Sequence, residues 1–129
     1  MIDALSEARE IQMAAARVGF DWPDARGAMS KLREEIDELD RAMALGGRDG
    51  IREELGDVLF SVVNVSRFVP VDAAEALRGS NRKFAGRFAQ VSEEIVRRGR
   101  RMEECSLDEL DAVWKAMKNR DTGGDRPEI

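Results

Sequence analysis

Two short acidic segments carry the residues best placed for chemistry in this sequence. Glu35 and Glu38 are three residues apart in the first segment, and Glu54 and Asp57 are three apart in the second. On a helix, residues three apart share one face, because successive residues turn by about 100°. Acidic side chains gathered on a face in this way can bind hard divalent cations, so a cation site is one interpretation of this spacing.

Both acidic pairs border apolar stripes, which places them at the edge of a core. Lys31, Glu35 and Glu38 form one narrow stripe, and its apolar neighbour contains Leu32, Ile36, Leu39 and Met43. The second pair flanks Leu55, Val58, Leu59, Val62 and Val65. If the two helices pack antiparallel through these stripes, four carboxylates converge and repel one another unless a cation compensates them. Oxygen ligands without nearby His or Cys favour Mg²⁺, or Mn²⁺ in its place, over zinc.

A plain solvated acidic surface is the competing interpretation. Glutamate-rich helices are common, and most of their charged faces serve solubility. Ordinary partners at i,i+4 are scarce for Glu35 and Glu38, however, which favours a cation over a lysine as their counter-charge.

The composition excludes several other classes of site. The chain has 129 residues, no histidine and one cysteine, Cys105, so His-dependent nucleophiles, histidine zinc sites and an internal disulfide are excluded. A net charge of -5 argues against broad nucleic-acid binding. One cysteine fits a reducing compartment, and we see neither a secretory signal nor an apolar run long enough for a membrane span, so we expect a cytoplasmic location.

Helices must position the acidic segments. The apolar fraction is 43%, aromatics are few, and glycines and prolines separate long stretches of helix-favouring residues. Five helices are predicted, at 3–18, 24–45, 49–69, 72–98 and 107–118. Asp72 is the expected N-cap of the fourth, where Gly79 is a potential break, and Ser106 with Glu109 forms a capping box for the last.

The predicted fold class is therefore all-α. The second and third helices, joined through Gly46 and Gly47, should form an antiparallel hairpin that contributes to a four-helix bundle. Residues 1–118 form one domain, and residues 119–129 form a polar, flexible tail. One chain of this length supplies a thin core, so we expect a homodimer or a higher homo-oligomer.

The acidic segments belong to a longer pattern. Glu34-Glu35-Ile36-Asp37-Glu38 followed by Glu54-Leu55-Gly56-Asp57 resembles the EExxE…ExxD signature of the MazG-type nucleoside triphosphate pyrophosphohydrolases. The resemblance covers residues 20–118 and is strongest to the second domain of bacterial MazG proteins that carry two in tandem. It includes the following further segments: Phe20-Asp21-Trp22-Pro23, Leu59-Phe60, Val63-Asn64, Arg67, Asn81-Arg82-Lys83-Phe84 and Arg87-Phe88.

This resemblance implies roles for individual residues. Glu35, Glu38, Glu54 and Asp57 match the family's magnesium ligands. Lys31, Lys83 and Arg87 match residues that contact the triphosphate, and Trp114 and Lys118 match further residues of the nucleotide site. The resemblance also implies an obligate dimer in which helices of both subunits complete each site.

Other positions keep two interpretations. Asn64 lies two turns beyond Asp57 and suits either a nucleotide contact or a buried hydrogen bond. Trp114 suits either base stacking or the docking of a helix. We expect Trp22 to pack and Phe84 and Phe88 to lie in the core. The Arg97–Arg101 cluster is expected to form solvated surface.

The leading hypothesis is magnesium-dependent hydrolysis of nucleoside triphosphates to the monophosphate and pyrophosphate, as house-cleaning of the nucleotide pool. Water would attack the α-phosphate, oriented by Glu34 or Glu35, and Glu38→Gln should abolish turnover. A narrower hypothesis is restriction to one substrate, such as a pyrimidine deoxynucleotide. The alternative from another class is a non-catalytic helical dimer that binds nucleotide and metal as a sensor or scaffold.

Overall fold

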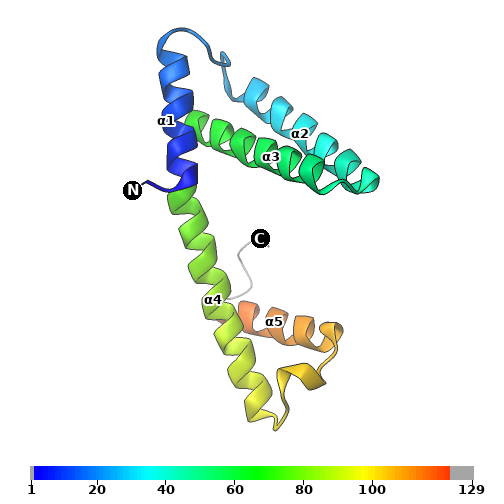
Figure 1. Ribbon diagram of the computed structural model, residues 1–129. Coiled ribbons are helices and arrows are strands. Elements are labelled where there is room, and N and C mark those ends of the chain that lie inside the picture. Colours follow the sequence, from blue (N-terminus) through cyan, green and yellow to red (C-terminus); the bar gives the residue numbers. More distant parts are fainter. Residues whose placement is uncertain (1, 123–129) are drawn as a thin grey trace. The chain divides into compact units, whose positions relative to one another are not determined.

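The computed structural model describes residues 2–122, and all regular structure within them is helical (Figure 1). This confirms the all-α class predicted from the sequence. The elements are α1 (Ala4–Arg17), α2 (Ala25–Leu45), α3 (Arg48–Phe68), α4 (Ala73–Arg97), a 3-10 turn (Met102–Glu104) and α5 (Leu107–Thr122).

Local capping residues explain where these helices begin and end. Asp24 accepts a first-turn backbone N–H at the start of α2, and Asp72 does the same for α4. Gly46 ends α2 in the left-handed conformation, with φ of 83°. Ser106 and Glu109 form the predicted capping box of α5, with reciprocal bonds of 3.1 and 3.2 Å.

The predicted helix bounds agree with the structure to within one residue, except at the end of α5. This helix continues four residues past Lys118, so residues 119–122 of the predicted tail are helical. The rest of that predicted tail, residues 123–129, lies outside the described residues. Gly79 does not interrupt α4, which is continuous across it.

Contacts divide the chain into two compact units, one ending at Leu77 and the other beginning at Arg78. In the first unit α2 and α3 run antiparallel as the predicted hairpin, and α1 packs against α3 (Figure 1). Its most buried side chains include Ala28 and Val63, at 0% and 1% exposure.

The apolar stripes expected to close the hairpin are only partly buried within one chain. On α3, Leu55, Leu59 and Val62 remain 41–49% exposed, and on α2 Ile36 and Met43 are 48% and 58% exposed. The stripes are wider than the line along which two helices touch, so one chain has the thin core expected from its length.

Trp22 packs against the first turn of α2, as expected. A Cβ atom added at Gly27 would lie 2.7 Å from Cε3 of the Trp22 ring, closer than van der Waals contact allows. Glycine at this position therefore lets the segment between α1 and α2 lie directly on the helix that carries Glu35.

Gly27→Ala is expected to lower the free energy of unfolding by about 1–2 kcal/mol, because the ring must move away from the helix. Gly50→Ala is the matched control, since Gly50 is also the third residue of its helix and has open space around it. The control should raise stability by up to about 1 kcal/mol through helix propensity. Urea melts followed by circular dichroism at 222 nm measure both values, and equal effects in the two variants would contradict the packing role.

The second unit has a core of its own between α4 and α5. Val91, Ile95, Val113 and Met117 are buried together, and Trp114 packs partly against them. The predicted solvated arginine cluster lies at the end of α4 and just beyond it, and its members pair with acids: Arg97 and Arg98 with Glu94, Arg100 with Glu109, and Arg101 with Glu104.

Phe84 and Phe88 do not lie in this core, and the prediction that they do was wrong. They are 60% and 47% exposed, and their rings stack in parallel with centroids 6.3 Å apart. Phe84 also touches Trp114, with ring centroids 5.1 Å apart. The two phenylalanines thus extend the core of the second unit into an exposed aromatic surface.

No helix within residues 2–122 is both long enough and apolar enough to cross a bilayer.

Candidate active site

Three of the four predicted carboxylates meet across the α2–α3 hairpin. Glu35 comes from α2, and Glu54 and Asp57 come from successive turns of α3. One carboxylate oxygen from each lies within 4.8 Å of the other two. Glu35 is 7% exposed, Glu54 is half-buried and Asp57 is exposed, so the cluster runs from the protein interior to its surface.

The electrostatics of Glu54 show the cost of this arrangement. Burial raises the pKa of Glu54 above its ordinary value, and the neighbouring negative charges of four acids raise it further, in the order Asp57, Glu38, Glu35 and Glu53. Glu38 thus lies within electrostatic range of the cluster, although it does not belong to the group whose oxygens meet.

Glu35 and Glu38 both have cationic partners, although the sequence analysis expected such partners to be scarce. Lys31 Nζ lies 2.9 Å from Glu35 at i,i+4, and an Arg41 nitrogen lies 2.9 Å from Glu38 at i,i+3. That inference was wrong, since it overlooked Lys31 itself and arginine at the shorter spacing. Lys31 also lies 3.5 Å from Glu34, whose side chain is 60% exposed. The pairing with Glu35 is the main cause of a raised Lys31 pKa.

A cavity of about 600 Å³ opens beside the cluster within the first unit. Glu35, Asp57 and Lys31 line it on one side. The remaining lining comes from α1, α3 and the segment between α1 and α2: Ile11, Gln12, Ala15, Gly19, Phe20, Asp21, Trp22, Phe60, Ser61, Asn64 and Arg67. An apolar and aromatic cavity with a few polar and charged groups suits a small organic ligand.

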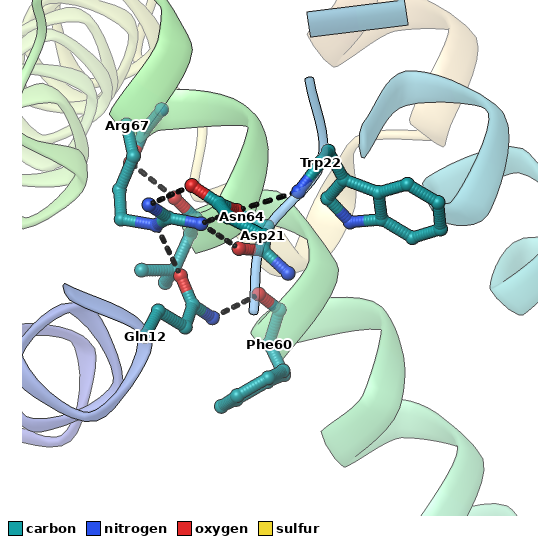
Figure 2. A network of polar contacts seen from close by, with 8 residues as sticks. Gln12, Asp21, Trp22, Phe60, Asn64 and Arg67 are labelled. Atoms are coloured by element: carbon teal, nitrogen blue, oxygen red, sulfur yellow. Dashed lines mark hydrogen bonds and ion pairs between the residues drawn. The ribbon is translucent and has the colours of Figure 1, made fainter. Parts of the chain in front are cut away.

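A polar network closes the side of the cavity around Arg67 (Figure 2). The guanidinium donates to both carboxylate oxygens of Asp21, at 2.7 and 3.1 Å, and to Asn64 Oδ1 at 2.6 Å. Its Nε donates to Gln12 Oε1 at 3.1 Å, and Gln12 Nε2 donates to the Phe60 carbonyl at 3.0 Å. These bonds tie α1 and the α1–α2 segment to α3, and those from Arg67 are the largest cause of the lowered pKa of Asp21.

Sequence reasoning missed the importance of this network. The family resemblance includes Asp21 and Arg67 but implies no role for either of them. Gln12 lies outside the residues that the resemblance covers. Gln12 is 5% exposed on an amphipathic helix, directly after the apolar Ile11. A polar residue at the edge of an apolar face was the available signal, but its partner 55 residues away cannot be read from sequence.

The other predicted substrate residues belong to the second unit. Arg87 is buried at 7% exposure, and its guanidinium carbon lies 5.7 Å from the centroid of the Trp114 ring. Lys83 is exposed one turn earlier on α4, and Lys118 is half-buried one turn after Trp114 on α5. The structure therefore brings Arg87 and Trp114 together, and Trp114 fits the helix-docking interpretation through its packing against the core.

Comparison with known proteins agrees with this geometry. The MazG nucleotide pyrophosphohydrolase domain matches residues 24–92, which is more than half of the chain and contains the whole α2–α3 hairpin. The chain belongs to the MazG family. It is 45% identical over 121 residues to the nucleoside triphosphate pyrophosphohydrolase/pyrophosphatase MazG of Thermotoga maritima, and 35% identical over 122 residues to the nucleoside triphosphate pyrophosphohydrolase of Escherichia coli K12.

These alignments cover 94% and 93% of the chain but 46% of each relative. The chain thus spans about half the length of the curated MazG relatives that it matches. The MazG match includes all three clustered carboxylates, together with Lys31 and Asn64 of the cavity.

Proposed function

We propose that this MazG domain hydrolyses nucleoside triphosphates to the monophosphate and pyrophosphate with the help of a divalent cation. One observation carries the proposal: Glu35, Glu54 and Asp57 meet within 4.8 Å, and two of them line a cavity large enough for a nucleoside. The names of the Thermotoga and E. coli relatives point to the same reaction.

The donor set fits Mg²⁺, with Mn²⁺ as a substitute. All three groups are carboxylates, and the sequence contains no histidine. Burial and, after it, the neighbouring acids raise the pKa of Glu54, and a bound cation would offset both effects. Glu38 is the proposed fourth ligand, since it belongs to the acidic signature of the family and its charge acts on Glu54 more strongly than that of Glu35. When bound, a divalent cation supplies positive charge to the phosphates and favours the ionised form of a nearby water.

The chain's own residues supply positioning and proton transfer. In the proposed reaction, a water oxygen bonds to the α-phosphorus, the bond from that phosphorus to the bridging oxygen breaks, and pyrophosphate leaves. A carboxylate takes the water proton. Glu35 suits this role better than Glu34, because Glu35 faces the cavity whereas the Glu34 side chain is 60% exposed and outside the lining.

Basic residues bind the triphosphate in this scheme. Lys31 lies at the cavity edge beside Glu35 and is placed to exchange this partner for a phosphate oxygen. Lys83, Arg87, Trp114 and Lys118 are proposed as further nucleotide-binding residues, as the family resemblance implies. Arg87 and Trp114 support this through their mutual packing, which holds a cation and an aromatic ring in one place.

We propose that the protein works as a homodimer. The support is the apolar surface that one chain leaves open on α2 and α3, where Leu55, Leu59 and Met43 are 46–58% exposed. Exposed apolar faces of this kind on paired helices are covered in four-helix bundles. A second copy would provide the other two helices.

The experiment is pyrophosphate release from a panel of ribo- and deoxynucleoside triphosphates, with Mg²⁺ and then with excess EDTA. We expect release with Mg²⁺ at values of kcat typical of enzymes in general, about 1–1000 s⁻¹, and none with EDTA. Release of orthophosphate in place of pyrophosphate would contradict attack at the α-phosphate. Selectivity across the panel separates general house-cleaning from restriction to one nucleotide.

The alternative, a sensor or scaffold that binds nucleotide and metal without turnover, predicts a different result in the same experiment. Nucleotide would bind in the presence of Mg²⁺, and neither pyrophosphate nor orthophosphate would accumulate. The clustered carboxylates could hold a metal in either case, and it is the pyrophosphohydrolase names of the relatives that favour the enzyme.

A further inference from the structure

Arg67 holds two side-chain amides, and its chemistry fixes the direction in which each points. A guanidinium carries only N–H donors, so an amide that contacts it must present its oxygen. Gln12 Oε1 and Asn64 Oδ1 both face the guanidinium, as Figure 2 shows. The NH₂ group of each amide therefore lies on the side away from Arg67.

The two NH₂ groups differ in what they reach. The NH₂ of Gln12 donates to the Phe60 carbonyl at 3.0 Å, so both ends of this amide are bound within the protein. The NH₂ of Asn64 has no acceptor among the described residues, although Asn64 lines the same cavity as Glu35 and Asp57. Gln12 thus completes a structural link, whereas Asn64 keeps one donor for something outside the protein.

We propose that Arg67 is a positioning residue that turns the NH₂ group of Asn64 toward an acceptor oxygen of the bound nucleotide. This inference rests on the proposed function for its ligand, and it adds the chemistry of one contact. The ligand atom must be an acceptor, such as a base carbonyl, a sugar oxygen or a phosphate oxygen, because Asn64 offers it only N–H.

Arg67 is well placed for this role because other groups hold it firmly. Its side chain is 9% exposed, and the two-point pairing with Asp21 fixes the plane of the guanidinium. Four donor–acceptor contacts converge on one side chain. Without Arg67, the Asn64 amide could rotate by about 180° and present its oxygen instead, which repels an anionic ligand.

A double-mutant cycle in the full 129-residue chain tests this coupling. The probe is a nucleoside triphosphate whose α,β-bridging oxygen is replaced by NH, so that binding is measured by calorimetry with Mg²⁺ and without turnover. Arg67→Lys keeps the positive charge but loses the planar guanidinium with its several N–H donors. Asn64→Leu removes the amide, and the double variant combines both changes.

We expect Asn64→Leu to raise Kd about ten-fold and Arg67→Lys about five-fold, in line with the loss of one hydrogen bond. In the Asn64→Leu background, Arg67→Lys should change Kd less than about two-fold, because its effect passes through Asn64. Equal effects of Arg67→Lys in both backgrounds would overturn the proposal. So would an unchanged Kd in Asn64→Leu, or a wild-type chain that binds no probe.

Two controls separate positioning from general stability. Gln12→Met removes the other amide on the same guanidinium, so it should lower Tm yet change Kd less than about three-fold, since Asp21 still holds Arg67. A ten-fold change in Kd there would overturn the proposal. Asn64→Asp keeps the contact with Arg67 and replaces NH₂ by oxygen, so it should bind the probe at least as weakly as Asn64→Leu. If Asn64→Leu does not fold, Asn64→Asp takes its place in the test.

A parallel titration with inorganic triphosphate identifies the acceptor. Weaker binding of this probe in Asn64→Leu supports a phosphate oxygen, and weaker binding of the nucleotide probe alone supports an oxygen of the base or sugar. A wild-type chain that shows the coupling in Kd but releases no pyrophosphate from natural triphosphates would refute the proposed activity and leave this inference standing.

Discussion

Glu54→Gln is expected to lower kcat for pyrophosphate release on the order of a thousand-fold, because the cation that depends on it is worth several kcal/mol to the reaction. Gln has the same shape and keeps one oxygen, so the substitution removes charge while changing the packing little. The fold should survive, since Glu54 makes no ion pair with any residue of the described part of the chain and forms part of a mutually repelling cluster. The measurement is steady-state pyrophosphate release at saturating Mg²⁺, with circular dichroism as a check on folding.

Glu53→Gln is the matched control. Glu53 is the preceding residue on α3, is exposed, and lies outside the cluster whose oxygens meet. Its loss removes the same formal charge from the same helix, so kcat should stay within about three-fold of the wild-type value. A similar large fall in both variants would mean that the net charge of α3, and not a cation site, controls the activity.

Glu38→Gln tests the one predicted ligand that the structure leaves outside the cluster. As the fourth proposed ligand, Glu38 must give up its 2.9 Å contact with Arg41 when the cation binds. We expect Glu38→Gln to abolish turnover and Arg41→Met to preserve it, because Arg41 only occupies the carboxylate of the free protein. Near-normal activity in Glu38→Gln, beside an inactive Glu54→Gln, would reduce the ligand set to the three that already meet.

Local signals explain how much of this fold the sequence could predict. Capping residues such as Asp24, Asp72 and Ser106 act within one helical turn, so they specify where a helix begins whatever surrounds it. The i,i+3 spacing of Glu35 with Glu38 and of Glu54 with Asp57 is local as well. The antiparallel hairpin then follows from the short glycine turn that joins the two helices.

Contacts between distant segments were beyond sequence reasoning. Nothing local links Gln12 to Arg67, yet their contact closes one side of the cavity. Burial was misjudged for a related reason. Phe84 and Phe88 lie on the apolar face of α4, but α5 covers only part of that face, so both rings remain exposed. Helical periodicity shows which face of a helix is apolar. It does not show how much of that face a neighbouring helix will cover.

Removal of the divalent cation is expected to lower the stability of the wild-type chain and to change its pH dependence. At a Mg²⁺ concentration about a hundred times Kd, binding to the folded state alone adds about 2.7 kcal/mol to the free energy of unfolding. Glu54→Gln should gain much less from Mg²⁺, because one ligand and one charge are missing. Thermal melts with Mg²⁺ and with EDTA measure both effects.

The sign of the pH effect follows from the raised pKa of Glu54 in the free protein. Between the ordinary value of 4.5 and the raised value, the folded state holds this proton more tightly than the unfolded state does. The contribution of Glu54 to stability is therefore present at low pH and is lost as the pH rises through that window. Above it, the ionised carboxylates repel one another in the folded state only.

Mg²⁺ must act in the opposite direction, because a cation binds the ionised carboxylates. With EDTA at pH 7, Glu54→Gln should therefore be more stable than the wild type, and with saturating Mg²⁺ the order should reverse. A surface cluster screened by solvent would show neither the gain nor the reversal. Glu53→Gln should show no reversal relative to the wild type, because Glu53 lies outside the cluster and is the weakest of the neighbouring charges that act on Glu54. The reversal links the repulsion among Glu35, Glu54 and Asp57 to the ion that they are proposed to hold. Melting curves that keep one order under both conditions would separate the cluster from metal binding.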